Sequence, residues 1–332
     1  MKMNKNLENL SSYQVEIAEE SITRCHANES QSSILPIEIL AKNILDNLNR
    51  YPEKSYQDLT IEASKFYNTG NNLIIPVNGS DEGLDLIIRS FCNPNDEIVI
   101  LNPTFAMYKQ YAIAFGLQVL EFDLDSNFEL NIEEFIAFCQ KNNPKIVFIP
   151  NPLAPTGNVT NRLDLIKIIE NLPEAFIVID EAYIEFSNQQ SIIDLLLQYQ
   201  NLIVTRTLSK FFGLAGVRLG FVFTQYKSEI MKIKSPYNVN QISCQIGINL
   251  FQNLAHDLIN NRYNQNLIKK EKMIKWLKQF KEVIKIHPSY TNFLFIELNC
   301  NSKEFGSKVL KEFNIKIKTF SDMFEKFCRI SF

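Results

Sequence analysis

Long apolar runs and a net positive charge are both missing from this chain of 332 residues. No apolar stretch approaches the roughly 20 residues that a membrane-spanning helix needs, and the first ten residues are polar, unlike a secretory leader. The formal net charge is −3, which argues against a surface built for nucleic acid or anionic lipid. The sequence therefore predicts a cytoplasmic protein with neither a membrane nor a nucleic-acid partner.

Clusters of cysteine and histidine are also missing, and glycine is scarce. The six cysteines contain no CxxC pair and the three histidines are scattered, which disfavours both a zinc site and a disulfide framework, so we expect no metal. Neither GxGxxG nor GxxxxGK[ST] occurs, which removes the main support for a dinucleotide or P-loop site. Six of the ten glycines nevertheless fall in three short segments: Gly79, Gly83, Gly157, Gly213, Gly216 and Gly220. Such clustering indicates unusual backbone geometry there.

What is present is a regular alternation of strand and helix patterns. The predicted strands are residues 73–77, 97–101, 118–122, 145–150, 176–180, 202–206 and 219–223. The predicted helices between them are residues 81–91, 107–115, 132–141, 163–170 and 192–198. This alternation predicts an α/β fold with a mostly parallel sheet, helices on both faces, and ligands at the carboxyl ends of the strands.

The remaining sequence has a different pattern. Residues 229–281 are strongly helical, and they are followed by strand patterns at 287–298 and 314–319 with a helix at 303–313 between them. At roughly 150 residues per domain, the length predicts about two domains. We expect an N-terminal arm (residues 1–40) packing with the small domain, a large domain (41–228) and a small α+β domain (229–332).

Four polar segments lie where the ligand edge of the sheet should be. Residues 78–83 join a strand to a helix, and their free N–H groups could hold an anion, although a plain helix cap explains this segment better when it is taken alone. Asp180 ends an apolar run, and a carboxylate there needs a donating or cationic partner, or forms a structural ion pair. Residues 151–157 form a rigid turn with no obvious chemistry.

The fourth segment, residues 206–218, is the richest. It follows a predicted strand and contains Thr207, Ser209, Lys210 and Arg218 around a glycine-rich turn. Hydroxyls and a guanidinium can bind phosphate, and a lysine amine can form an imine with a carbonyl compound. Because residues suited to phosphate binding and to imine formation occur together here, a loop that is basic only by chance explains this segment poorly.

Together, these segments resemble the fold-type-I pyridoxal-phosphate (PLP) enzymes of the class I and II aminotransferase superfamily, and more closely its histidinol-phosphate branch. The resemblance runs from about residue 10 to the end. The stretches that carry it are residues 12–14, 27–29, 48–53, 79–91, 103–108, 178–186 and 206–220. It implies a seven-stranded sheet, and PLP-dependent transamination of histidinol phosphate with 2-oxoglutarate in histidine biosynthesis.

The resemblance also implies roles for individual residues. Lys210 would be the lysine that links to PLP and moves the proton, Asp180 would keep the pyridine nitrogen protonated, and Tyr183 would bond the phenolic O3′. The implied ligands of the PLP phosphate are Ser80, Asp81, Glu82, Thr207, Ser209 and Arg218. Phe105 would stack on the ring. Tyr51 would reach the cofactor of a neighbouring subunit, which implies a homodimer with shared sites.

The substrate residues are implied by resemblance alone. Arg329 would bind a substrate anion, against the alternative of a surface arginine, and Lys318 lies near the position of a second such arginine. The other implied substrate residues are Tyr13, Asn28 and Asn292.

Two departures from the family pattern stand out. Ala154 occupies the position before Pro-Thr-Gly where the family carries an asparagine that donates to O3′. The nearby Asn151 belongs to another position of the turn and cannot be assumed to replace it. The family also continues with a further helix beyond the strand of Arg329, so we expect that helix to be lacking here.

Other functions share most of this pattern. An aromatic-amino-acid aminotransferase or a phospho-amino-acid decarboxylase would use the same cofactor residues. A binding or regulatory protein with poor turnover is a third alternative, motivated by Ala154, but Asp180, Tyr183, Lys210 and Arg218 are all present.

Overall fold

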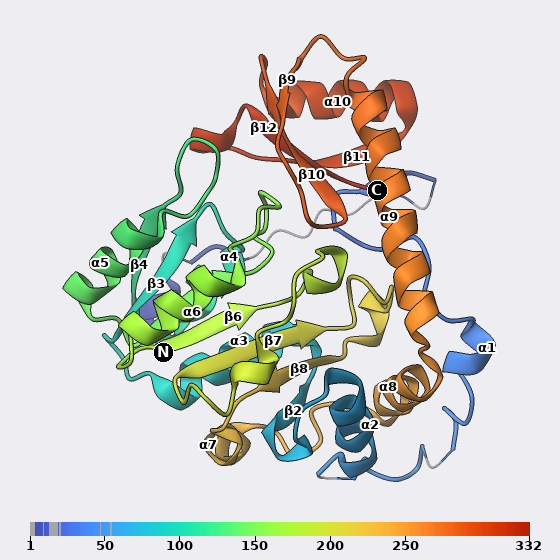
Figure 1. The fold of residues 1–332 in the computed structure, drawn as a ribbon. Coiled ribbons are helices and arrows are strands. Elements are labelled where there is room, and N and C mark those ends of the chain that lie inside the picture. Colours follow the sequence, from blue (N-terminus) through green and yellow to red (C-terminus); the bar gives the residue numbers. More distant parts are fainter. Residues whose placement is uncertain (1–3, 9, 13–18, 20, 47, 54) are drawn as a thin grey trace.

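The computed structural model describes residues 4–332 apart from residues 9, 13–18, 20, 47 and 54. The described residues form a seven-stranded sheet with strand order β2-β8-β7-β6-β5-β3-β4 (Figure 1). Its strands are β2 (Ile74–Val77), β3 (Glu97–Asn102), β4 (Gln118–Asp123), β5 (Ile146–Pro150), β6 (Phe176–Asp180), β7 (Leu202–Thr207) and β8 (Gly220–Phe223). Only β8 runs antiparallel to its neighbours, so the predicted α/β class and the mostly parallel sheet are confirmed.

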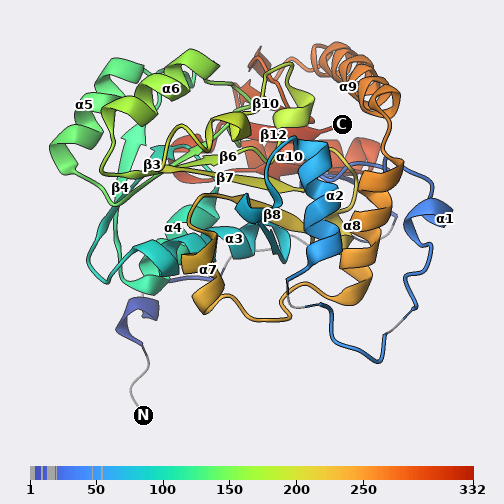
Figure 2. The same cartoon turned by 60° about the horizontal axis from the view of Figure 1, so that its bottom comes forward.

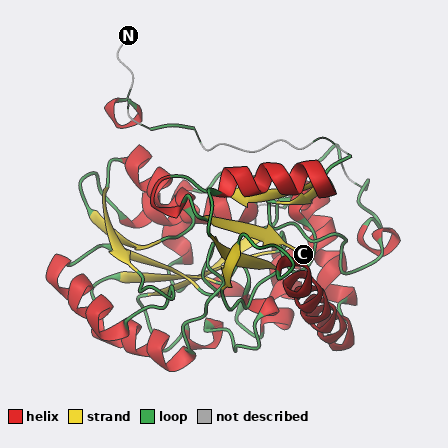
Figure 3. Ribbon diagram, turned by 90° about the horizontal axis from the view of Figure 1, so that it is seen from above, coloured by secondary structure: helices red, strands yellow, loops and turns green. Residues whose placement is uncertain are grey.

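Helices cover both faces of this sheet, as Figure 3 shows from above. One face packs against α3 (Gly79–Phe91), α4 (Ala106–Phe115) and α7 (Lys227–Ile233). The other packs against α2 (Gln57–Tyr67), α5 (Ile132–Asn142), α6 (Arg162–Asn171) and α8 (Gln241–Asn253). Alternating strand residues supply the two cores: Val147 and Ile149 face one side, and Ile146 and Phe148 face the other. This period-two alternation of apolar residues is what buries both faces.

A second sheet lies to one side of the first, at the top of Figure 1. In the described part of the chain its strand order is β1-β11-β12-β10-β9. These strands are β1 (Thr23–Cys25), β9 (Val283–Ile286), β10 (Phe293–Leu298), β11 (Ile315–Thr319) and β12 (Phe327–Ser331). Helix α10 (Ser302–Phe313) and the long α9 (His256–Leu277) pack on it. Strand β1, which lies in the predicted arm, pairs in parallel with β11, which places residues 23–25 beside this sheet.

Shorter elements complete the structure. Helix α1 (Ile37–Leu40) packs against α8, and α2 and α8 lie side by side (Figure 2). The 3₁₀ helices are Lys5–Leu7, Asn71–Leu73, Ile184–Phe186, Ile193–Leu195, Ala215–Val217 and Asp322–Phe324. No helix formed by the described residues is long and apolar enough to cross a membrane.

Two local predictions are wrong. Residues 192–198 form only the 3₁₀ turn Ile193–Leu195 in place of a helix: the Leu195 N–H donates to the Ile192 carbonyl at 3.0 Å and the Leu196 N–H donates to the Ile193 carbonyl at 3.1 Å, so these backbone bonds span three residues and not four. Glu181 Oε1 accepts the Ile192 N–H at 2.9 Å and Ser191 Oγ accepts the Ile193 N–H at 3.2 Å, which caps the start of the turn. The strand pattern at 287–298 begins late, at Phe293, because residues 287–292 form the loop between β9 and β10.

Candidate active site

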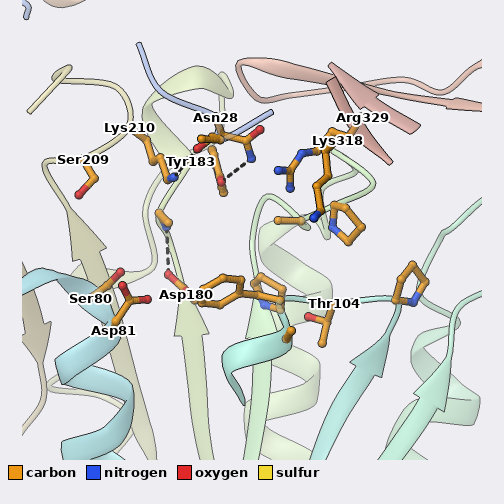
Figure 4. A pocket seen from close by; sticks show the side chains of 18 of the residues that line it. Asn28, Ser80, Asp81, Thr104, Asp180, Tyr183, Ser209, Lys210, Lys318 and Arg329 are labelled. Atoms are coloured by element: carbon orange, nitrogen blue, oxygen red, sulfur yellow. Dashed lines mark hydrogen bonds between the residues drawn. The ribbon is translucent and has the colours of Figure 1, made fainter. Parts of the chain in front are cut away.

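A cavity of about 610 Å³ opens at the carboxyl ends of the large-sheet strands. Its wall contains residues from the strand ends, from the arm segment 26–28, and from β11 and β12 of the small sheet (Figure 4). The described lining includes five basic side chains, Arg24, Lys210, Arg218, Lys318 and Arg329, against two carboxylates, Asp81 and Asp180. A cavity with this excess of positive charge favours anionic ligands.

Asp180 lies at the floor of the cavity, at the end of β6. Its Oδ1 accepts from Thr205 Oγ1 at 2.9 Å and from the Ala182 N–H at 3.2 Å, and its Oδ2 accepts from Tyr108 Oη at 2.7 Å. Burial raises the pKa of this carboxyl, and the donated hydrogen bonds oppose that rise. Asp180 forms no salt bridge with any described residue. A buried carboxylate held by donors and lacking a cation fits the protonated pyridine nitrogen of PLP.

The N-terminus of α3 and the loop after β7 form a cradle on the other side. Arg218 donates to Asp81 Oδ2 at 3.1 Å and to Ser209 Oγ at 3.4 Å. A Cβ at Gly79, where φ is +76°, would lie 2.4 Å from Arg218 Nη2, so only glycine fits there. The Arg218 guanidinium, the Ser209 hydroxyl and the backbone N–H groups at the start of α3 together fit a phosphate.

Lys210 and Tyr183 meet the arm at the top of the cavity (Figure 4). Lys210 Nζ donates to the Ala27 carbonyl at 3.4 Å and lies 5.8 Å from the centre of the Tyr183 ring. The Tyr183 hydroxyl accepts from Asn28 Nδ2 at 2.9 Å. Lys210 is therefore held by a single long hydrogen bond to the backbone among the described contacts, which leaves its amine able to move within the cavity.

Arg329 and Lys318 are neighbours across the β11–β12 pair, and both line the cavity. Arg329 Nη2 donates to the His26 carbonyl at 2.8 Å, and its guanidinium lies 5.3 Å from the centre of the Phe293 ring. Two cations side by side on adjacent strands suit a dianionic group, or two anionic groups on one molecule.

Most predicted site residues are brought together here. The cavity lining contains Asn28, Ser80, Asp81, Phe105, Asp180, Tyr183, Thr207, Ser209, Lys210, Arg218 and Arg329. Asn292 lies behind the wall, where its Nδ2 donates to the Asn28 carbonyl at 3.1 Å. Tyr13 lies outside the described residues.

Glu82 and Tyr51 are not part of this wall. The Glu82 carboxylate accepts a hydrogen bond from Asn238 Nδ2 at 2.6 Å. Its side chain therefore points toward the loop that precedes α8 and not toward the cradle. Tyr51 is 79 % exposed and stacks on Tyr237 with ring centroids 4.5 Å apart. A role for Tyr51 at a neighbour's cofactor needs a second subunit and stays a prediction.

The turn at residues 151–157 gives the cavity wall no side-chain hydrogen-bond donor, since its lining residues are Ala154 and Pro155. Ala154 presents a methyl group at the cavity wall. Asn151 does not replace the missing asparagine, because its Nδ2 donates to the Thr160 carbonyl at 3.1 Å and its Oδ1 accepts the Thr160 N–H at 2.9 Å. Both the nitrogen and the oxygen of the Asn151 amide are therefore already bonded to the Thr160 backbone.

Several lining residues were not predicted. Tyr108 lies three positions after Phe105 in a stretch that carries the resemblance, and only the fold brings its hydroxyl to Asp180. Thr104 Oγ1 is buried at the wall without a hydrogen-bond partner among the described groups. Phe320 and Phe324 come from the β11–β12 connection, whose sequence carries no recognisable motif. The described residues contain no group of three or more His, Cys, Asp or Glu side chains arranged to hold a metal ion.

Comparisons with known proteins agree with this geometry. A family model described as aminotransferase class I and II matches residues 6–332. Histidinol-phosphate aminotransferase of Clostridium novyi is 36 % identical over 301 residues, covering 89 % of this chain and 83 % of the relative. The enzyme of the same name from Flavobacterium johnsoniae is 33 % identical over 289 residues, covering 86 % and 82 %.

Solved structures show the same fold. Histidinol-phosphate aminotransferase from Sinorhizobium meliloti, in complex with pyridoxal-5′-phosphate, superposes with a TM-score of 0.85 at 19 % identity, covering 93 % of this chain and 86 % of that one. L-threonine-O-3-phosphate decarboxylase from Porphyromonas gingivalis superposes with a TM-score of 0.80 at 20 % identity, covering 94 % of each chain. With the family match over residues 6–332, these findings place the chain in the class I and II aminotransferase family.

Proposed function

We propose that this protein is a PLP-dependent aminotransferase that transfers the amino group of histidinol phosphate to 2-oxoglutarate, giving imidazole-acetol phosphate and glutamate. The observation that carries the proposal is the convergence of Lys210, Asp180 and the Arg218 cradle on one cavity. Curated relatives at 32–36 % identity over most of their length carry the name histidinol-phosphate aminotransferase, which supports this substrate.

PLP, when bound, supplies an electron sink for the electrons released at the substrate Cα. Arg218, Ser209, Thr207 and the α3 N-terminus would bind its phosphate. Asp180 would hold the proton on the pyridine nitrogen, which keeps the sink effective. Phe105 at the cavity wall offers a ring for stacking, and Tyr183 would donate to O3′. Lys210 would link to C4′ and, once displaced by the substrate amine, would carry the proton between Cα and C4′.

The substrate side of the cavity suits both reactants. Arg329 and Lys318 together would bind the phosphate of histidinol phosphate, or the carboxylates of glutamate and 2-oxoglutarate. Phe320 and Phe324 add an apolar wall that suits an imidazole ring. The same wall suits an aromatic amino acid, which keeps an aromatic aminotransferase as the second candidate.

A homodimer is part of the proposal. Large apolar side chains are exposed along the segment 37–51 and near Tyr237: Ile37, Leu45, Leu48, Tyr51, Tyr237 and Ile242. A second copy of the chain would cover them and bring Tyr51 to the neighbouring cofactor. The division into an arm (1–40), a large domain (41–228) and a small domain (229–332), and a cytoplasmic location, belong to the same proposal.

Single-turnover absorbance measurements test the function. The PLP-loaded protein is mixed separately with histidinol phosphate, glutamate, phenylalanine, tyrosine and phosphothreonine, with Lys210→Ala as the control. We expect histidinol phosphate and glutamate to convert the cofactor fastest and the control to stay unreacted. Faster conversion by phenylalanine or tyrosine would favour the aromatic aminotransferase. Release of carbon dioxide from phosphothreonine would favour a decarboxylase.

A further inference from the structure

Asn28 is the most buried of the described arm residues that line the cavity. It is 2 % exposed and adopts the left-handed conformation, with φ of 54°. Its backbone is fixed by the small sheet, because Asn292 Nδ2 donates to its carbonyl at 3.1 Å and its own N–H donates to Ser331 Oγ at 3.1 Å. Its side chain crosses to Tyr183, which follows β6 of the large sheet (Figure 4).

The hydrogen-bond network defines which end of the Asn28 amide faces Tyr183. Ser331 Oγ accepts the Asn28 N–H, so its own hydrogen is available to donate to Asn28 Oδ1 at 2.8 Å. With Oδ1 occupied by Ser331, Nδ2 faces the Tyr183 hydroxyl at 2.9 Å and donates to it. Tyr183 is therefore the acceptor in this contact.

An oxygen that accepts one hydrogen bond has its own proton free for another partner. Among the described residues, no group accepts the proton of Tyr183, and its ring lies at the cavity wall. A donated hydrogen bond also polarises the receiving hydroxyl and makes it a stronger donor. Asn28 thus leaves Tyr183 with an O–H directed at whatever acceptor enters the cavity.

The surroundings show why this matters in the present chain. Elsewhere in the cavity lining, Ala154 offers only a methyl group, and both ends of the Asn151 amide are bonded to Thr160. The side chain of Tyr183 is then the main donor available near the proposed position of O3′. The strength and direction of the hydrogen bond donated by the Tyr183 O–H decide how well the negative charge on O3′ is stabilised.

We propose that Asn28 is a positioning residue that acts through Tyr183: by donating to the tyrosine oxygen, its amide directs the tyrosine O–H onto the cofactor O3′ and compensates for the methyl group of Ala154. The inference rests on the proposed PLP chemistry. A stronger donor stabilises the O3′ anion and so makes the neighbouring nitrogen release its proton at lower pH. Asn28 therefore lowers the pKa of that nitrogen, whose protonation state changes the visible absorbance of the bound cofactor.

The test is a pH titration of the visible absorbance of the PLP-loaded protein. For Asn28→Ala we expect that pKa to rise by about one unit, a tenfold change in the proton equilibrium. For Asn28→Asp we expect a larger rise, because a carboxylate accepts the Tyr183 proton and turns it away from O3′. Ser331→Ala, which loosens the amide without removing it, should produce a smaller rise in the same direction.

Matched variants separate this role from a general loosening of the arm. Asn292→Ala removes a bond to the Asn28 backbone but no contact with Tyr183, and should leave the pKa unchanged. In a Tyr183→Phe background, Asn28→Ala should add no further shift. Adding Ala154→Asn to Asn28→Ala should bring the pKa back down, since it restores a donor to O3′.

The opposite results would overturn the inference. An unchanged pKa in both Asn28→Ala and Ser331→Ala, or an equal rise in Asn292→Ala, would show that Asn28 does not act through Tyr183. If Asn28→Ala does not fold, the Ser331→Ala and Asn28→Asp titrations decide. A native protein that gives no visible absorbance with PLP would instead contradict the proposed function, so the two failures are distinguishable.

Discussion

At the scale of single residues, the site depends on buried polar groups whose partners come from distant parts of the chain. Asp180 receives hydrogen bonds from Tyr108 on α4, from Thr205 on β7 and from the Ala182 backbone. Tyr108 is fully buried and stacks on Phe148, so its hydroxyl has little freedom to turn elsewhere. The carboxylate is consequently held in one orientation before any ligand enters.

Tyr108→Phe removes the donor to Asp180 Oδ2 while keeping the stacked ring. A hydrogen bond to a charged group contributes roughly 1.5–3 kcal/mol, so we expect PLP to bind at least about tenfold more weakly. Fluorescence titration of the apoprotein with PLP measures this change. Tyr111→Phe on the same helix, which forms no bond with Asp180, is the matched control, and equal losses in both variants would contradict a specific role.

Arg329→Ala should separate substrate binding from cofactor binding. Removing the guanidinium loses charge-assisted hydrogen bonds to the substrate anion, so we expect KM for histidinol phosphate to rise by about tenfold or more while PLP affinity changes little. Steady-state kinetics and PLP titration measure the two quantities. A parallel loss in both would mean that Arg329 supports the arm through its bond to the His26 carbonyl and does not touch the substrate.

At the scale of elements, close contacts couple the cradle to the sheet. Gly83 lies in α3 directly against β8, and a Cβ there would lie 2.7 Å from Val222 Cγ2 and 3.5 Å from Val77 Cγ2. The helix that carries Ser80 and Asp81 therefore packs closer to the sheet than a side chain would permit. That distance positions the α3 N-terminus beside Arg218.

Gly83→Ala should push α3 away from β8. Overpacking of this kind costs about 1–3 kcal/mol, and we expect a lower free energy of unfolding together with weaker PLP binding. Urea denaturation and PLP titration measure both effects. Val222→Ala removes the colliding methyl groups, so the double variant should be more stable than the sum of the two single changes predicts. Strict additivity would show that the contact does not limit the position of α3.

His287 joins an aromatic cluster between the two sheets. Its ring lies 5.0 Å from that of Phe128, which precedes α5, and also contacts Phe295 of β10 and Phe327 of β12. The side chain is buried and neither ring nitrogen has a hydrogen-bond partner among the described groups. Burial, assisted by the Lys285 charge, lowers the pKa of His287 to about 4.

This lowered pKa predicts a loss of stability in mild acid. The unfolded chain, with an ordinary histidine pKa of about 6.5, takes up a proton as the pH falls below that value, whereas the folded chain does so only near pH 4. Stability therefore falls between these values, by about 2 kcal/mol from pH 7.5 to pH 5 for this group. Urea denaturation should show this loss reduced in His287→Phe; an identical pH dependence in both proteins would contradict it.

At the scale of the whole molecule, the proposed dimer decides whether each site is complete. The segment 37–51, which carries exposed apolar residues, begins at α1, away from the small sheet (Figure 1), and Tyr51 stacks on Tyr237 instead of lining the cavity of its own chain. A large exposed apolar surface of this kind is typical of a protein–protein interface.

Leu45→Asp should therefore yield monomers that retain PLP poorly, and Tyr51→Phe should yield dimers in which PLP binds more weakly. Light scattering gives the oligomeric state and absorbance gives the bound cofactor. Ile284→Asp, which places the same charge on an exposed apolar residue of β9, is the control and should change neither. A native monomer in solution, or full PLP retention by Tyr51→Phe, would contradict the shared site.

Much of the fold and the cofactor side of the site was predictable from local sequence. Strands with continuous apolar runs, such as residues 176–180, are readable because both faces of a parallel sheet are buried. The meeting of Asp180, Lys210 and Arg218 at one edge was predictable because Asp180 ends β6 and the other two residues lie in the connection after β7. The helix predicted at 192–198 is wrong because the backbone there closes three-residue 3₁₀ bonds, which apolar spacing over so short a segment does not distinguish from an α-helical turn.

The sequence by itself determined the α/β alternation, the seven strands and the placement of the polar segments, because those depend on side-chain periodicity and on chemistry carried by neighbouring residues. Only the tertiary structure decided that Tyr108 bonds Asp180, 72 residues away, and that Asn28 bonds Tyr183, 155 residues away. The first contact exists because α4 packs on one face of the large sheet, and the second because Asn28 of the arm lies between β12 of the small sheet and the loop after β6 of the large sheet. A hydrogen bond between such distant residues depends on how the sheets pack, and no local pattern records it.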